Sequence, residues 1–156
     1  MNIVVCVKHV PDAQSERTFR ESDSTIDREG VDGLLSELDE YAVEEALKLV
    51  EAAGEGEVTV LTVGPAGAAD AIKKALQMGA HAGIHVSDEA IHGSDAAATS
   101  LVLAEAVKKA TGGNPELVLT GMASTDGVMG VVPAMLAERL GLPQVTFASE
   151  LTIADG

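Results

Sequence analysis

The chain alternates between short apolar runs rich in β-branched residues and longer stretches whose apolar positions recur at helical spacing. The short runs predict buried strands at 3–7, 58–63, 82–86, 117–120 and 145–147. The longer stretches predict helices over 39–53, 65–79, 95–110 and 129–140. Strands and helices that alternate at this spacing imply right-handed crossovers. The pattern therefore predicts an α/β fold, with an open parallel sheet covered by helices on both faces.

Two segments fall outside this alternation. Residues 14–32 are charged and lack sustained periodicity, so we expect a long excursion with a short edge hairpin around 25–27. After it, Ser36 followed by Asp39 is expected to cap the first helix. At the other end, residues 150–156 form a β-like run that stops at a turn residue without a partner. We therefore expect 1–149 to form one domain and 150–156 to begin a further segment that is cut short.

Composition and charge restrict the possible partners. Hydrophobic residues make up 46% of the chain but aromatic residues only 2%, so the core must be built from Ala, Val, Leu and Ile. The formal net charge of -15 repels nucleic-acid backbones and anionic lipid. It fits either a well-solvated, salt-adapted surface or an acidic docking face. A single cysteine, Cys6, and no apolar run long enough for a membrane span lead us to expect a cytoplasmic protein without membrane insertion.

Candidate binding residues follow the first, second and fourth predicted strands, because ligands of open α/β sheets sit outside the carboxyl ends of the strands. After the fourth strand, Gly121, Gly127 and Gly130 allow close backbone approach, and Ser124 and Thr125 offer hydroxyl groups. The helix start that follows presents free N–H groups to an anion, so we expect a phosphate near 127–132. An ordinary helix cap would have a similar composition. Neither Gly-x-Gly-x-x-Gly nor a Walker lysine motif is present.

No catalytic constellation stands out in the sequence. The four histidines, His9, His81, His85 and His92, show no metal-ligand spacing, and we expect no metal site. Cys6 lies in a strand without an evident base and is interpreted as a small core residue. By its own residues, this chain is predicted to bind a ligand and not to catalyse a reaction.

Ordered blocks along nearly the whole chain resemble a known family. These blocks are Val5-Cys6-Val7-Lys8, Val10-Pro11-Asp12, Asp39 to Leu47, Val63-Gly64-Pro65, Ala75 to Ala80, Gly121 to Gly130, Leu142-Pro143-Gln144 and Thr146 to Ser149. Together they are similar to the beta subunits of electron transfer flavoproteins, also called the FixA group. The resemblance implies a Rossmann-like domain of the adenine nucleotide alpha hydrolase-like kind over 1–149.

The resemblance also implies function and partners. A beta subunit of this family buries AMP and pairs with an alpha subunit that carries the redox-active FAD. Electrons come from flavin dehydrogenases such as acyl-CoA dehydrogenases. The family's AMP contacts, largely through backbone atoms, fall here on Cys6, Ser36, Glu37, Leu38, Asp39, Val63, Asp126, Gly127, Val128, Met129, Gly130, Val131 and Val132.

Three alternatives stay open at this stage. Some relatives carry a second FAD in place of AMP and bifurcate electrons. A nucleotide-binding sensor of the universal-stress type would share the sheet, although its glycine spacing differs from that of Gly121, Gly127 and Gly130. A small adenylating or hydrolytic enzyme would need a phosphate-gripping lysine, for which Lys8 is the candidate.

Overall fold

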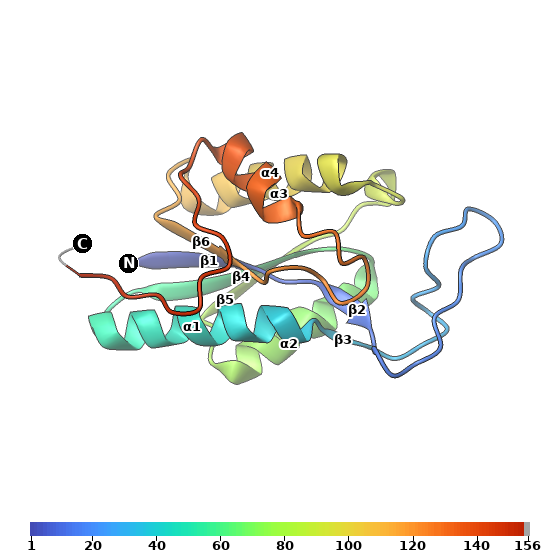
Figure 1. Cartoon of the computed structure of the whole chain (residues 1–156), viewed down its shortest axis with the longest axis horizontal. Coiled ribbons are helices and arrows are strands. Elements are labelled where there is room, and N and C mark those ends of the chain that lie inside the picture. The colour runs from blue at the N-terminus through green and yellow to red at the C-terminus, as the bar shows by residue number, and fades with distance from the viewer. Residues whose placement is uncertain (155–156) are drawn as a thin grey trace.

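A four-stranded parallel sheet with the order β5-β4-β1-β6 forms the centre of the computed structural model, which describes residues 1–154 (Figure 1). The strands are β1 (Asn2–Cys6), β4 (Glu57–Val63), β5 (Ala82–Val86) and β6 (Leu117–Thr120). The chain runs from β1 through β4 to β5 and then crosses back to place β6 on the other side of β1. This reversal of strand order lies between β1 and β6, where a crevice for a ligand is expected.

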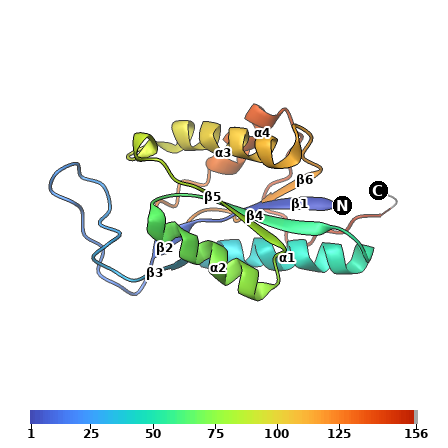
Figure 2. The ribbon, with the colours of Figure 1, turned by 180° about the vertical axis from the view of Figure 1, so that it is seen from behind.

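Two pairs of helices cover the sheet (Figure 2). Helices α1 (Glu37–Ala53) and α2 (Ala69–Met78) pack on one face, and α3 (Ala96–Thr111) and α4 (Val132–Leu140) pack on the other. A 3-10 turn at Ala66–Ala68 leads into α2, and another at Glu89–Ile91 precedes α3. The predicted α/β fold with an open, Rossmann-like parallel sheet is confirmed.

Alternation along β1 divides the core between the two faces. Ile3 and Val5 pack with α1 and α2, whereas Val4 and Cys6 pack with α3 and α4. All four side chains are buried. A strand covered on both faces must be apolar at every position, which explains the continuous run at 3–7. Small residues such as Ala104 let the helices approach the sheet closely.

The helices end at the glycines that the sequence indicated, whereas the starts of α1 and α4 differ from the prediction. Gly54, Gly112 and Gly141 end α1, α3 and α4 in left-handed conformation, which glycine adopts without strain. The prediction that α4 begins at 129 is wrong, because Gly130 has a φ of 65° and the helix starts only at Val132.

The predicted side-chain cap of α1 is also wrong. Ser36 occupies the N-cap position, but its hydroxyl is buried without a hydrogen-bond partner among the described residues. The Asp39 carboxylate points away from the helix and accepts a hydrogen bond from the Lys8 backbone N–H at 2.8 Å. Asp39 thus ties α1 to the end of β1.

The excursion after β1 contains more structure than the sequence indicated. Short strands β2 (His9–Pro11) and β3 (Gly33–Leu35) pair antiparallel at its base. The hairpin expected around 25–27 is reduced to one antiparallel bridge between Phe19 and Ile26. Figure 1 shows the excursion reaching out from the β2–β3 end of the molecule.

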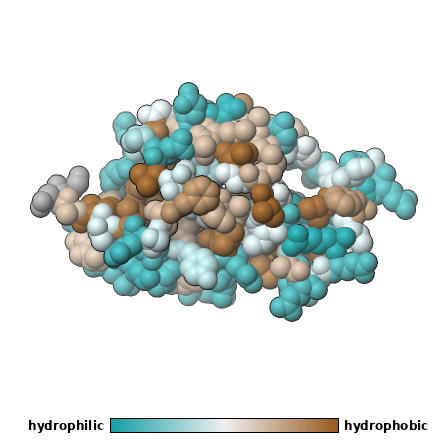
Figure 3. All heavy atoms as spheres, viewed as in Figure 1, coloured by the Kyte–Doolittle hydropathy of each residue, from teal (hydrophilic) through white to brown (hydrophobic). Residues whose placement is uncertain are grey.

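The strand predicted at 145–147 does not form. Residues 143–154 are irregular, and no strand among residues 1–154 pairs with the outer edge of β6. Phe147 has a φ of 55°, which interrupts an extended chain, and its side chain is exposed together with Val145. Apolar side chains therefore gather where this segment crosses the molecule (Figure 3). The β-like run at 150–156 is irregular over 150–154, and the rest of it lies outside the described residues.

Candidate functional site

A pocket of about 320 Å³ opens at the carboxyl ends of β1, β4 and β6, beside the reversal of strand order. Its lining comes from the loop after β1, the start of α3, the loop after β6 and the first turns of α4. The lining residues are Cys6, Val7, Lys8, Asp39, Val63, Ser94, Asp95, Ala96, Thr99, Leu103, Thr120, Gly121, Ala123, Ser124, Gly127, Met129, Gly130, Val132, Pro133 and Leu136.

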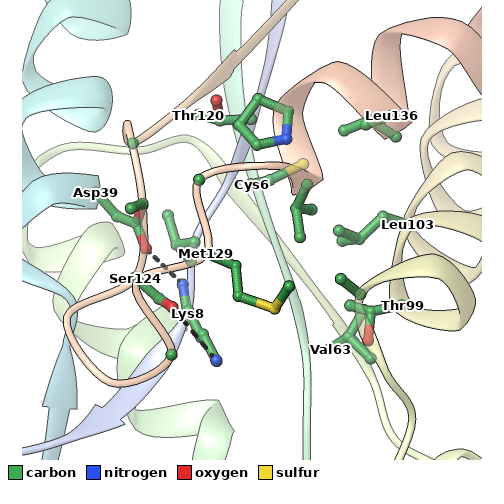
Figure 4. A pocket seen from close by; sticks show the side chains of 18 of the residues that line it. Cys6, Lys8, Asp39, Val63, Thr99, Leu103, Thr120, Ser124, Met129 and Leu136 are labelled. Atoms are coloured by element: carbon green, nitrogen blue, oxygen red, sulfur yellow. Dashed lines mark hydrogen bonds between the residues drawn. The ribbon is translucent and has the colours of Figure 1, made fainter.

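The pocket has one polar and one apolar side (Figure 4). Lys8, Asp39 and Ser124 lie on the polar side, and Leu103 and Leu136 lie opposite. A pocket that is mostly apolar with a few convergent polar groups is typical of small-molecule sites. This pocket suits a ligand with a flat apolar part and a charged part.

Several of the residues expected to bind a ligand do line this pocket. They are Cys6, Asp39, Val63, Gly127, Met129, Gly130 and Val132. The others lie near the pocket in sequence but outside its lining, namely Ser36, Glu37, Leu38, Asp126, Val128 and Val131. The pocket thus lies at the edge of the sheet where the loop rule expects a ligand, and the assignment of single residues to ligand binding stays a prediction.

The loop between β6 and α4 holds a strained conformation beside the pocket. Val128 has a φ of 51°, in the left-handed region that a β-branched side chain rarely adopts. Its N–H donates to the Ser124 carbonyl at 3.1 Å, which closes a turn. At the start of α4, Val131 occupies the N-cap position and no side chain among residues 1–154 caps it. Pro133 in this first turn has no N–H, so the backbone N–H groups of Val132 and Ala134 are the ones that favour an anion.

Asp39 is a buried carboxylate in the pocket wall. It accepts hydrogen bonds from the backbone N–H groups of Lys8 and Gly121. Burial is the largest effect and raises the pKa of Asp39 to about 7, although these two hydrogen bonds and the charge of Lys8 favour the ionised form. A Cβ at position 121 would collide with the Asp39 carboxylate. Glycine is therefore required where the loop passes over Asp39.

Asp126 is a second buried carboxylate, and it forms two ion pairs. Its oxygens lie 2.9 Å from Lys8 Nζ and 2.9 Å from an Arg28 guanidinium nitrogen. Burial alone would raise its pKa, but the hydrogen bond and charge of Lys8, with the hydrogen bonds from Ser124 and Arg28, hold the pKa below its ordinary value. Asp126 is thus ionised and fixed outside the pocket lining, where it orients Lys8.

The remaining titratable candidates show no catalytic arrangement. Burial, followed by the Asp39 charge, raises the pKa of the Cys6 thiol to about 12, which keeps the thiol neutral. His81 accepts from the Val58 N–H, and His85 lies 3.0 Å from the Gly64 carbonyl oxygen. Within the described residues, no group of three or more His, Cys, Asp or Glu side chains is arranged to hold a metal ion.

Sequence reasoning missed one wall of the pocket and one of its charged neighbours. Ser94, Asp95 and Thr99 come from the start of α3, which follows β5. Asp95 caps this helix by accepting from the Ala98 N–H at 2.8 Å, so a Ser-Asp pair after an apolar run was the available signal. For Arg28, which lies far from the loop after β6 in sequence, no local signal exists.

Comparison with known proteins now identifies the relationship. A family model described as the electron transfer flavoprotein domain matches residues 23–156. The chain is 50% identical over 159 residues to the electron transfer flavoprotein subunit beta of Mycobacterium tuberculosis, an alignment that covers 99% of this chain and 59% of that protein. It is 42% identical over 157 residues to the protein FixA of Rhizobium meliloti, with 99% of this chain and 53% of that protein covered.

The chain therefore spans little more than half the length of these relatives. In the part of the chain that the structure describes, no helix has the length and apolar character needed to cross a membrane. The family match over most of the chain, the high identity and the shared α/β fold agree with one another. The chain belongs to the electron transfer flavoprotein family and matches its beta-subunit and FixA members.

Proposed function

We propose that this chain is the nucleotide-binding portion of an electron transfer flavoprotein beta subunit, and that its pocket holds AMP as a structural mononucleotide. The observation that carries the proposal is the convergence of three loops on one pocket beside the start of α4. The free N–H groups of α4 and the ammonium group of Lys8 suit a phosphate. Leu103 and Leu136 on the opposite side suit an adenine ring.

The size of the pocket favours a mononucleotide over a dinucleotide. A volume of about 320 Å³ lies at the lower end of the range for small-molecule pockets, which extends to roughly 1,000 Å³. This volume suits AMP, so the proposal favours AMP over a second FAD of the kind carried by relatives that bifurcate electrons. The residues that would contact AMP are the family-predicted residues that line the pocket, with Thr120, Ser94 and Thr99 added from the rest of the lining.

In this proposal the chain is a partner of an electron carrier and has no catalytic role of its own. The neutral Cys6 thiol and the engaged histidines support a binding function. The partner would be the alpha subunit, which supplies FAD as the redox group of the heterodimer. The electron donors would be flavin dehydrogenases such as acyl-CoA dehydrogenases, and the compartment would be the cytoplasm.

Mass spectrometry of the bound ligands tests this proposal. The chain is expressed together with its alpha subunit, the complex is purified under native conditions, and ligands are released by heat. We expect AMP and FAD in equal amounts. FAD in twofold amount without AMP would mean that FAD occupies this pocket, and FAD in single amount without any second nucleotide would contradict the proposal.

A further inference from the structure

The excursion between β2 and β3, residues 12–32, is fastened to the two loops that border the pocket, and we call it the strap. Arg28 reaches the Asp126 carboxylate at 2.9 Å, and Arg17 donates to the Thr125 carbonyl at 3.1 Å. At its tip, Asp23 lies 3.0 Å from the His92 ring. The strap thus contacts the loop before α4 and the loop before α3, although its own residues do not line the pocket.

Arg28 makes the most buried of these contacts. Its guanidinium group donates both to Asp126 and to the His9 carbonyl, the latter at 3.2 Å. The Asp126 side chain is 1% exposed, and Lys8 occupies its other oxygen. One buried carboxylate therefore holds two cations, one from the strap and one from the pocket wall.

The charges of this cluster do not cancel. Lys8 and Arg28 bring two positive charges and Asp126 brings one negative charge, so these three groups together carry one positive charge beside the pocket. The Asp39 carboxylate also faces Lys8 in the pocket wall and adds negative charge where it is ionised, but this addition is present with or without Arg28. Other cations of this chain of net charge -15 share two acidic neighbours each. Arg20, also on the strap, lies near both Asp27 and Glu29, and Lys48 lies near both Glu44 and Glu45.

On the basis of the proposed function, we infer that Arg28 determines the preference of the pocket for a phosphorylated nucleoside over the nucleoside itself. Because Arg28 shares the single charge of Asp126 with Lys8, part of the positive charge of the Lys8 ammonium group, which lines the pocket, stays uncompensated and attracts an anionic ligand. Without Arg28, the pair of Lys8 and Asp126 is neutral and the attraction falls. Arg28 is a positioning residue, since it acts on the ligand through Asp126 and Lys8.

Calorimetric titration with AMP and with adenosine tests this inference. A unit charge at several Å in partly screened surroundings changes the affinity for an anion about tenfold. We expect Arg28→Gln to lower AMP affinity about tenfold while adenosine affinity stays unchanged, and Arg28→Lys to restore much of the AMP affinity. Arg20→Gln is the matched control, because it removes the same charge from the same strap and should leave both affinities unchanged.

A double variant separates charge from folding. Arg28→Gln combined with Asp126→Asn leaves Lys8 as the lone charge of the cluster, so the preference for AMP should return even where Arg28→Gln alone is unstable. An unchanged ratio of AMP to adenosine affinity in Arg28→Gln, or an equal drop in Arg20→Gln, would overturn the inference while the proposed function stands. Wild-type protein that binds neither ligand would overturn both.

Discussion

Replacing Asp39 by asparagine should change the pH dependence of stability in a defined way. The Asp39 side chain is buried at the start of α1, and its pKa rises from 3.8 to about 7 on folding, mainly through burial. Between these two values the folded state binds more protons at this site than the unfolded state does. The contribution of Asp39 therefore makes the protein less stable as the pH rises from about 4 to 7 and stays constant above that.

The size of the effect follows from the same pKa values. Each pH unit in this window is worth about 1.4 kcal/mol, so the ionised Asp39 costs up to about 4 kcal/mol at alkaline pH. Asparagine removes this cost but keeps a single acceptor oxygen for the N–H groups of Lys8 and Gly121, a loss of about 1–3 kcal/mol. That second amount does not depend on pH. The difference in unfolding free energy between Asp39→Asn and wild type should therefore grow by about 3 kcal/mol from pH ~5 to pH ~8.5.

Urea unfolding of both proteins at the two pH values measures this difference. The comparison with the variant is necessary because His9 titrates in the same region with the opposite sign. Burial lowers the pKa of His9, so its contribution to stability increases as the pH rises towards 6.5. Asp126, whose pKa is lowered, stabilises the folded state by a constant amount above the ordinary pKa of an aspartate and loses this contribution only as the pH falls below it, so it does not change between pH ~5 and pH ~8.5. A difference between variant and wild type that stays constant with pH would refute this account of Asp39.

Two glycine substitutions test the loop before α4. Val128→Gly should raise the unfolding free energy by about 1 kcal/mol, because glycine removes the strain of a left-handed valine. Val131→Gly, at a φ of -100°, should lower the unfolding free energy. Urea unfolding measures both variants, and a destabilising Val128→Gly would contradict the presence of strain at Val128. Gly121→Ala should cost more than about 2 kcal/mol and weaken AMP binding, because the new Cβ collides with Asp39. Position 54 has open space around it, so Gly54→Ala should lower the unfolding free energy only by the strain of a left-handed alanine, about 1–2 kcal/mol. AMP affinity measured by calorimetry should stay unchanged.

The sequence indicated the sheet well because its central strands are buried on both faces. A continuous apolar run such as the one leading to Cys6 has few other stable positions in a domain of this size. The run at 145–147 also consists of residues that favour strands, but it has no ladder partner in the described residues, and composition alone does not supply one. Strand propensity therefore gave all four strands of the sheet and failed for the run beyond β6.

The location of the pocket could also be predicted, whereas its charges could not. Parallel strands bring the loops after β1, β4 and β6 to one edge whatever their sequence, so topology indicates these loops, while the family resemblance indicates Cys6 and Val63 within them. The contact between Arg28 and Asp126 joins positions that are 98 residues apart. Such a contact depends on the path of the strap, for which the charged and aperiodic sequence carries no pattern.

A crystal structure of the protein with AMP tests the central claim most directly. We expect the phosphate within hydrogen-bond distance of the backbone N–H groups at the start of α4, with Lys8 beside it and the adenine ring on the side of Leu103 and Leu136. AMP bound elsewhere on the molecule, or a pocket that stays empty at saturating AMP, would contradict the assignment of this pocket as a nucleotide site.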